Sequence, residues 1–362
     1  MLRLITQSKQ GEEQLISLHP ISRPVANAGH VLRQRPGRLF SAAIRTLLPV
    51  LLLVSGMGTA MAQAYPNKAV KLVAPFPPGG PTDVIARVVG AEIAKALGQS
   101  VFVENRPGAA GAIGADYVAK SAPDGYTICF CTTGPLVTLP LLDPKLPFVP
   151  ATDLLPVSQV NRLELVLAAR NNLEASTIQQ LVAAAKANPG KLTYATPGTG
   201  SPNHLAMELL KMMAGIDIVP VPFKGDQPAL NDLLGGHVDL FIGAVLSAAP
   251  LIKSGKIKAI AVTGAQRSRM LADTPTIAES GFPTYEASTF AGIHAPRDTP
   301  KPIIDRLHAA VAVAVAVPAI QERLASEGMV AVSSRPEAYA EYIRGESEKW
   351  AKVMKQSGIK LN

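Results

Sequence analysis

The chain has 362 residues, 48% of them hydrophobic and 17% charged, which fits a globular protein large enough for two domains. The formal net charge is +8, but no basic stripe with interleaved aromatic residues occurs, so we expect no nucleic-acid partner. Aromatic residues make up only 5%, while 29 Gly and 31 Pro residues indicate many tight turns around a core of small aliphatic side chains.

The first 64 residues, 1–64, are predicted to be a leader that contains a secretory signal peptide. Basic residues precede an apolar run at 46–54, which is too short to span a bilayer as a membrane anchor, the alternative interpretation. Small residues follow, and cleavage near Ala62 or Ala64 would release a soluble protein into the periplasm. The remaining chain has 28 basic and 25 acidic residues, a net charge of +3, so much of the basic character belongs to the leader.

The two cysteines, Cys129 and Cys131, lie in an apolar segment at 126–132. Residues two apart on a strand share a face, and we judge this geometry poor for a disulfide. We therefore interpret the pair as two small core residues. A disulfide remains the alternative because an exported protein meets an oxidising compartment.

A strand–loop–helix unit opens the mature chain. The apolar segment 70–75 predicts a strand, and the Pro/Gly-rich segment 77–81 ends it. Thr82 or Asp83 is expected to cap a helix that carries an apolar residue at every fourth position and stops at Gly98.

The same arrangement occurs again in the middle of the chain. The segment 192–196 predicts a strand, and a Pro/Gly loop at 197–200 follows it. Ser201 is predicted to cap the next helix, with Pro202 at its first position and Gly215 at its end.

The remaining elements also alternate between strand and helix, which favours an α/β protein with mostly parallel sheets. Further strands are predicted at 101–104, 126–132, 163–168, 219–223, 238–242 and 258–263, and helices at 109–120, 178–187, 228–234, 303–314 and 337–356.

The two Pro/Gly loops are candidates for an anion site. The start of a helix exposes unpaired backbone N–H groups and carries partial positive charge, so Phe76–Asp83 and Pro197–Ser201 could hold one carboxylate between them. The hydroxyls of Thr82, Thr199 and Ser201 would add donors. The alternative is that each loop only starts its helix.

Other chemistries find less support. The segment after Gly198 lacks the third glycine of a dinucleotide fingerprint, and no Walker A pattern occurs, so we expect no cofactor. Ser201 and His204 are not part of a Gly-x-Ser-x-Gly elbow, so a hydrolase is disfavoured. The histidines are scattered, and we expect no metal site. Lys224 would either attract an anion or lie solvated in its loop.

At these loops the sequence resembles the Bug family, the periplasmic receptors of tripartite tricarboxylate transporters. The motifs that carry the resemblance span essentially the whole mature chain: Tyr65–Lys68, Pro75–Asp83, Glu104–Gly111, Pro123–Thr127, Thr196–Ser201 with His204-Leu205, Val221–Gly225, Leu233–Gly236, Pro275-Thr276 with Glu279–Gly281, and Ala295-Pro296 before Thr299-Pro300.

The resemblance implies a two-lobed, type II periplasmic-binding-protein fold without catalytic activity. Lobe one would comprise 65–165 and 289–362, and lobe two 166–288. A small organic acid, such as a dicarboxylate, an amino acid or an aromatic acid, would bind between the lobes. The receptor, expected to be a monomer, would deliver it to membrane transporter subunits. A periplasmic sensor that docks on a signalling partner is the alternative.

The resemblance also implies which residues line the cleft. These are Phe76, Gly80, Thr82, Asp83, Thr133 and Gly134 in lobe one, and Gly198, Thr199, Gly200, Ser201, His204, Phe223, Lys224 and Gly225 in lobe two. For Asp83, contact with the ligand and a purely structural capping role both stay open.

Several residues depart from the family pattern. Phe290 stands where the family often has Trp, and the Cys pair is unusual. Phe223 stands where the family often has Tyr, which removes a hydroxyl from the cleft wall. Asp226 stands where small residues are usual, and its charge near the site would favour a ligand with a hydrogen-bond donor or a single carboxylate.

Overall fold

The computed structural model describes residues 65–359. The leader predicted for 1–64, with its cleavage site, lies outside the described residues.

The first half of the chain builds a sheet whose core is parallel. β1 (Val70–Ala74) lies between β2 (Val101–Asn105) and β3 (Thr127–Thr132) and runs parallel to both. α2 (Pro81–Leu97) follows β1 and buries its apolar stripe, including Ile85, against this sheet. The first predicted strand–loop–helix unit is therefore confirmed.

A second sheet repeats this arrangement. β5 (Thr193–Thr196) lies between β6 (Val219–Pro222) and β7 (Leu240–Ala244), again in parallel. α7 (Pro202–Ala214) follows β5, which confirms the second predicted unit. β8 (Ile257–Val262) joins this sheet through antiparallel pairing with β4 (Leu154–Arg170).

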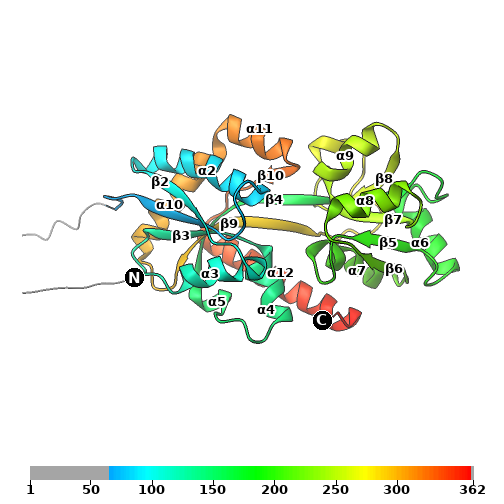
Figure 1. Ribbon diagram of the computed structural model, residues 1–362, viewed down its shortest axis with the longest axis horizontal. Helices are drawn as coiled ribbons and strands as arrows, with labels where there is room; N and C mark the ends of the chain where they lie inside the picture. Colours follow the sequence, from blue (N-terminus) through cyan, green and yellow to red (C-terminus); the bar gives the residue numbers. More distant parts are fainter. Residues whose placement is uncertain (1–64, 360–362) are drawn as a thin grey trace, which may run out of the picture. The chain divides into compact units, whose positions relative to one another are not determined.

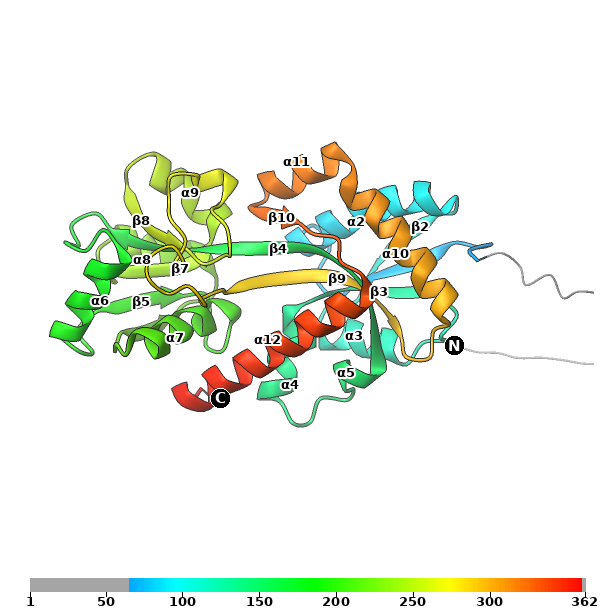
Figure 2. The same cartoon turned by 180° about the vertical axis from the view of Figure 1, so that it is seen from behind.

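Two long strands connect the sheets. β4 pairs antiparallel with β9 (Ser288–Pro296) and β10 (Met329–Ala331) in the first sheet, and with β7 and β8 in the second. Figures 1 and 2 show β4 and β9 running side by side between the two groups of strands. We call β4 and β9 the crossover strands. The result is a two-lobed α/β fold with a parallel core in each lobe.

The other helices flank the two sheets. They are α3 (Ala112–Ala119), α4 (Leu139–Leu142), α5 (Pro150–Asp153), α6 (Ile178–Ala187), α8 (Asp226–Leu234), α9 (Val245–Lys253), α10 (Lys301–Ala316), α11 (Pro318–Ser326) and α12 (Pro336–Ser357). α10 packs on α2, whereas α12 packs on the crossover strand β4 and on α7, the helix that follows β5. Trp350 of α12 is fully buried in the same hydrophobic cluster as Tyr194 of β5.

Between residues 65 and 359, no single helix has both the length and the apolar composition to cross a membrane. Only the pair α10 and α11, bent by 72° at the break between them, meets both criteria when taken together.

The structure corrects two expectations about the strands. The predicted strand at 163–168 extends over the whole of β4, and β9 was not predicted as a strand. Both β4 and β9 are buried for most of their length, because they lie between other strands and beneath helices. Neither strand therefore shows the polar–apolar alternation of a half-exposed strand.

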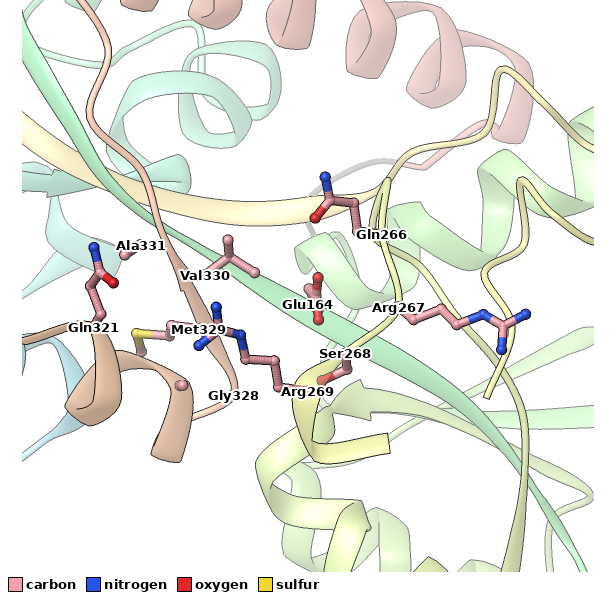
Figure 3. Close-up of a pocket in the computed structure, with 11 residues that line it drawn as sticks. Glu164, Gln266, Arg267, Ser268, Arg269, Gln321, Gly328, Met329, Val330 and Ala331 are labelled. Atoms are coloured by element: carbon pink, nitrogen blue, oxygen red, sulfur yellow. The ribbon is translucent and has the colours of Figure 1, made fainter. Parts of the chain in front are cut away.

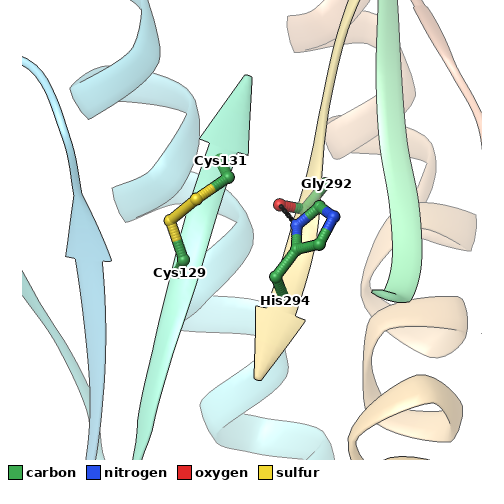
Figure 4. Close-up of a disulfide and its surroundings, with 4 residues drawn as sticks. All are labelled: Cys129, Cys131, Gly292 and His294. Atoms are coloured by element: carbon green, nitrogen blue, oxygen red, sulfur yellow. Dashed lines mark hydrogen bonds between the residues drawn. A yellow bond between two sulfur atoms is a disulfide. The ribbon is translucent and has the colours of Figure 1, made fainter. Parts of the chain in front are cut away.

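The cysteine pair is also corrected. Cys129 and Cys131 form a disulfide within β3, and both side chains are fully buried (Figure 4). Their Cα atoms are 5.2 Å apart, within the usual range for a disulfide, so our judgement of the i, i+2 geometry was wrong. His294 of the neighbouring strand β9 lies opposite Cys129 in the register.

Candidate ligand-binding site

The β1–α2 loop starts its helix without a side-chain cap. Gly80 occupies the cap position, and Pro81 takes the first helical position, so the predicted capping by Thr82 or Asp83 is wrong. Asp83, the third helical residue, instead reaches back and accepts the amide hydrogen of Gly79 at 2.9 Å. The carboxylate therefore fixes the residue before the cap, Gly79, and leaves the cap residue Gly80 without a side-chain hydrogen bond.

Asp83 is fully engaged by protein groups. The carboxylate is only 2% exposed, and it also accepts hydrogen bonds from the Arg87 guanidinium at 3.1 Å and from the Asn105 amide at 2.8 Å. Burial by itself would raise the pKa of Asp83, but the hydrogen bonds from Arg87, Gly79 and Asn105 lower it to about 2. Asn105 also donates to the carbonyl of Phe76 at 3.1 Å, so the network joins both ends of the loop.

The β5–α7 loop carries the predicted cap. Ser201 accepts the amide hydrogen of His204 at 3.2 Å, and Pro202 stands at the first helical position, as expected from the sequence. Gly200 has a φ of +71°, a conformation that glycine adopts without the steric cost that other residues meet.

His204 supports the same loop from inside. Its Nδ1 accepts the amide hydrogen of Gly200 at 3.0 Å, which places the ring proton of the neutral imidazole on Nε2. Nε2 lies 3.8 Å from Oε1 of Glu208, which also accepts from Tyr194 at 2.9 Å and pairs with Lys211 at 2.8 Å. Burial lowers the pKa of His204, against an opposite effect of Glu208.

A turn at 108–111 lies beside the predicted site residues of the first sheet. An ideal Cβ on Gly111 would lie 3.3 Å from Cζ of Phe76 and 3.3 Å from Cγ of Pro135. The turn has positive φ at four consecutive residues, including the non-glycine Ala109 (46°) and Ala110 (50°). Such conformations concentrate at ligand sites. We expected a helix from 109, and only the small residues between two glycines hinted at this turn.

The Thr133-Gly134 segment follows β3 directly. The hydroxyl of Thr133 accepts from the amide of Phe290 at 2.8 Å and donates to its carbonyl at 3.3 Å, which ties the end of β3 to the crossover strand β9. Gly134 lies beside the carbonyl of Ala110, at 3.2 Å from an ideal Cβ on Gly134.

The segment 223–225 lies beside the β5–α7 loop. The amide of Phe223 donates to the carbonyl of Thr196 at 2.8 Å, and Phe223 packs at the edge of the core of the second sheet. Lys224 is exposed and forms no ion pair within the described part of the chain. Gly225, with a φ of 110°, occupies the cap position of α8.

Asp226, the first residue of α8, holds a turn of the second sheet. Its carboxylate accepts hydrogen bonds from the Ser247 hydroxyl at 3.0 Å and the Ala244 amide at 3.2 Å, at the turn from β7 into α9. Burial raises the pKa of Asp226, which these hydrogen bonds partly offset. Its oxygens therefore stabilise a turn of the second sheet, and its effect on the charge of the ligand stays a prediction.

The structure thus collects the predicted residues into two groups. One comprises the β1–α2 loop, the turn 108–111 and Thr133-Gly134; the other comprises the β5–α7 loop and 223–225. The second group also touches the first half of the chain, because an ideal Cβ on Gly200 would lie 3.3 Å from Cδ1 of Leu142 in α4. Within residues 65–359, no three His, Cys, Asp or Glu side chains gather as metal ligands.

Comparison with known families shows which family the chain belongs to. The profile of the family described as "Tripartite tricarboxylate transporter family receptor" matches residues 85–359. The chain belongs to this family of periplasmic solute-binding receptors. The resemblance to Bug proteins inferred from the motifs is therefore confirmed.

Named relatives of this receptor are similar over most of the chain. Protein BugT of Bordetella pertussis is 38% identical over 301 residues, which cover 83% of this chain and 92% of BugT. The "UPF0065 protein in tcbD-tcbE intergenic region" of Pseudomonas sp. strain P51 is 37% identical over 300 residues, which cover 83% and 89% of the two chains.

Solved structures of periplasmic binding proteins share the fold of the receptor. The structure of BugD has a TM-score of 0.64 at 36% identity and covers 82% of this chain and 99% of BugD. R. palustris Rpa4515, solved with adipate, has a TM-score of 0.67 at 36% identity, covering 82% and 99%. MatC from Rhodopseudomonas palustris, solved with bound malate, has a TM-score of 0.63 at 33% identity, covering 80% and 99%.

Proposed function

We propose that this receptor captures a small carboxylate in the periplasm and delivers it to the membrane subunits of a tripartite tricarboxylate-type transporter. The observation that carries the proposal is the matched construction of the β1–α2 and β5–α7 loops. Each begins a helix with Pro at its first position, and each has a glycine amide held by the third helical residue.

The matched loops favour an anionic ligand. The first-turn amides of a helix have no partner within the helix, and the helix dipole adds partial positive charge at the same place. The amides of Gly79 and Gly200 are already taken by Asp83 and His204. We therefore assign ligand contact to the remaining backbone amides and to the hydroxyls of the two loops.

The proposed site divides into contacting and supporting residues. The contacting residues are Phe76, Gly80, Thr82, Gly134, Gly198, Thr199, Ser201, Phe223, Lys224 and Gly225. Gly200 supports the site, because its amide is bonded to His204. Asp83, Thr133 and His204 support the site, because their side-chain polar atoms are bonded within the protein.

We propose that lobe one comprises 65–165 with 289–362 and lobe two 166–288, so that the crossover strands form the hinge. A ligand that binds the closed arrangement more tightly shifts the population toward it. The related structures with adipate and malate support a dicarboxylate as the ligand class.

A thermal-shift screen tests the proposal. The mature protein is heated with adipate, malate and a series of monocarboxylates, amino acids and aromatic acids, and a ligand raises the melting temperature by mass action. Small-angle scattering with the best ligand should then show a smaller radius of gyration. A panel without any shift, or a ligand that leaves the radius unchanged, would contradict the proposal.

A double variant places the ligand. Ser201→Ala with Gly200→Pro removes the cap hydroxyl and the backbone conformation of the loop, because Pro cannot adopt the φ of +71° found at Gly200. This double variant should abolish the thermal shift. Ser254→Ala, an exposed serine at the end of α9, is the matched control and should retain the shift. Full binding by the double variant, with a cooperative unfolding transition, would mean that the ligand lies elsewhere.

A further inference from the structure

A buried carboxylate lies where the chain passes from one sheet to the other. In β4, Leu163 pairs with Met329 of the first sheet, and Leu165 pairs with Ala244 of the second. Glu164 stands between them and is only 4% exposed. Its side chain lines a cavity of about 280 Å³ (Figure 3) and also an adjoining cavity of about 230 Å³.

The walls of the larger cavity come from both sides of the crossover. Ser268 and Arg269 belong to the segment that follows β8 of the second sheet. Gln321 belongs to α11, and Gly328–Ala331 contains β10 of the first sheet. A molecule in this crossover pocket would therefore contact both sheets and the strand that joins them.

Glu164 forms no ion pair with any of the described residues. The nearby arginines are already paired: Arg162 with Glu286 at 3.1 Å and Arg267 with Glu279 at 2.9 Å. Burial raises the pKa of Glu164, and the Ser268 hydroxyl opposes this. A carboxylate in this position gains most from a cation that enters the cavity.

The backbone leaves room for the carboxylate. An ideal Cβ on Gly264 would lie 2.9 Å from Oε1 of Glu164, so a side chain at 264 would displace the acid from its position. The absence of a side chain at Gly264 therefore leaves the space that the Glu164 carboxyl group occupies.

A positive group lies at the rim of the same pocket. Arg269 is exposed and lines the cavity, and no carboxylate within the described ranges pairs with it. Figure 3 shows Arg269 reaching along the cavity toward Gln321 and Met329, whereas Arg267 points away. The pocket therefore presents a buried carboxyl group and an exposed guanidinium, and neither has an oppositely charged partner among residues 65–359.

We propose that the crossover pocket binds a small zwitterion, whose ammonium group pairs with Glu164 and whose anionic group pairs with Arg269. Its size is at the small end for ligand pockets, which suits a compact amino-acid-like molecule. This site is separate from the loops of the proposed carboxylate site. Because its walls come from both sheets, an occupant contacts both of them at once.

Calorimetric titration of the mature protein tests the proposal. The probes are glycine, β-alanine and 4-aminobutyrate, which differ in the spacing of their charges, with ethylammonium and acetate as single-charge comparisons. At least one zwitterion should bind, and both single-charge probes should bind at least tenfold more weakly. Glu164→Gln and Arg269→Gln should each weaken the zwitterion at least tenfold.

Controls separate this pocket from the carboxylate site and from misfolding. Glu341→Gln and Arg344→Gln, which affect an exposed pair on α12, should leave zwitterion binding unchanged. The double variant Ser201→Ala with Gly200→Pro should also retain it, whereas Glu164→Gln should retain the thermal shift by carboxylates. Each variant is compared by its unfolding transition.

Three results would overturn the proposal. The first is that none of the zwitterions binds the wild-type protein. The second is that binding survives unchanged in both Glu164→Gln and Arg269→Gln. The third is that zwitterion binding is lost only in the Ser201/Gly200 double variant, which would place the probe in the carboxylate site.

Discussion

Asp83 and His204 occupy equivalent positions in the two strand–loop–helix units and perform the same task. Each is the third residue of its helix, and each accepts the amide hydrogen of the glycine that precedes the cap, at 2.9 Å and 3.0 Å. One acceptor is a carboxylate and the other a neutral imidazole. The two loops therefore share a hydrogen-bond acceptor at the third helical position, although the residue that supplies it differs.

His204→Leu should loosen the β5–α7 loop. The variant leaves the Gly200 amide without its acceptor, which costs about 1–3 kcal/mol of unfolding free energy. Hydrogen exchange at Gly200, followed by NMR, should become faster. His204→Asn keeps an acceptor near the same place and should recover part of the loss. Equal exchange in all three proteins would contradict the assigned role.

Asp83→Asn should lower stability at neutral pH and not in acid. The pKa of Asp83 is depressed to about 2 in the folded protein. The contribution of ionised Asp83 to the free energy of unfolding is therefore complete above the unfolded-state pKa near 4, and it is lost as the pH falls toward 2. The shift corresponds to about 2 kcal/mol. Urea unfolding of both proteins between pH 6 and pH 2 should show the difference shrinking. A constant difference would mean that Asp83 acts without its charge.

His294 should make the protein sensitive to acid well above pH 4. It is fully buried, and burial lowers its pKa to about 4, with a smaller opposite effect from the Gly292 carbonyl. The folded protein therefore favours neutral His294. The contribution of His294 to the free energy of unfolding is complete above its unfolded-state pKa near 6.5, and it is lost as the pH falls toward 4. The difference between the folded and unfolded pKa values of His294 corresponds to about 3 kcal/mol of unfolding free energy.

His294→Leu should remove most of this pH dependence between pH 7 and pH 4. His237→Gln is the matched control, because the His237 side chain is 73% exposed and should leave the profile unchanged. Urea unfolding at several pH values supplies the measurement. An unaltered profile in His294→Leu would assign the acid sensitivity to other groups.

The Cys129–Cys131 disulfide should resist reduction in the folded protein. Both side chains are fully buried within β3, so a thiol reductant reaches them only after unfolding. Alkylation followed by mass spectrometry should label neither cysteine in native protein treated with dithiothreitol, and both in urea with dithiothreitol. Replacement of both by Ala should cost under about 2 kcal/mol from loop closure, because the loop is very short. Labelling of both cysteines in urea without reductant would contradict the disulfide.

Local patterns predicted the elements near the two loops. The strand, Pro/Gly loop and helix of each unit appear where expected, and Ser201 caps α7 as its position before Pro202 indicated. These features depend on residues within about one helical turn of each other, so the chain itself displays them. The small residues at 109–111 misled us, because they form a turn with positive φ before α3 begins.

Hydrogen-bond partners that come from elsewhere in the fold were not predictable in the same way. Asp226 looked like an additional charge near the ligand, but α9 brings Ser247 to it. Thr133 was expected to line the cleft, but its hydroxyl is bonded to the backbone of Phe290 in β9. In both cases the partner lies far along the chain.

The sequence by itself determined the family, the α/β class and the two glycine-rich helix starts, because these depend on motifs and on spacings of a few residues. Only the tertiary structure decided that β4 and β9 cross between the sheets, that the cysteines are joined, and that Glu164 is buried at the crossover without a basic partner. Burial and pairing of these groups depend on which distant strands and helices pack together, and no local pattern records that.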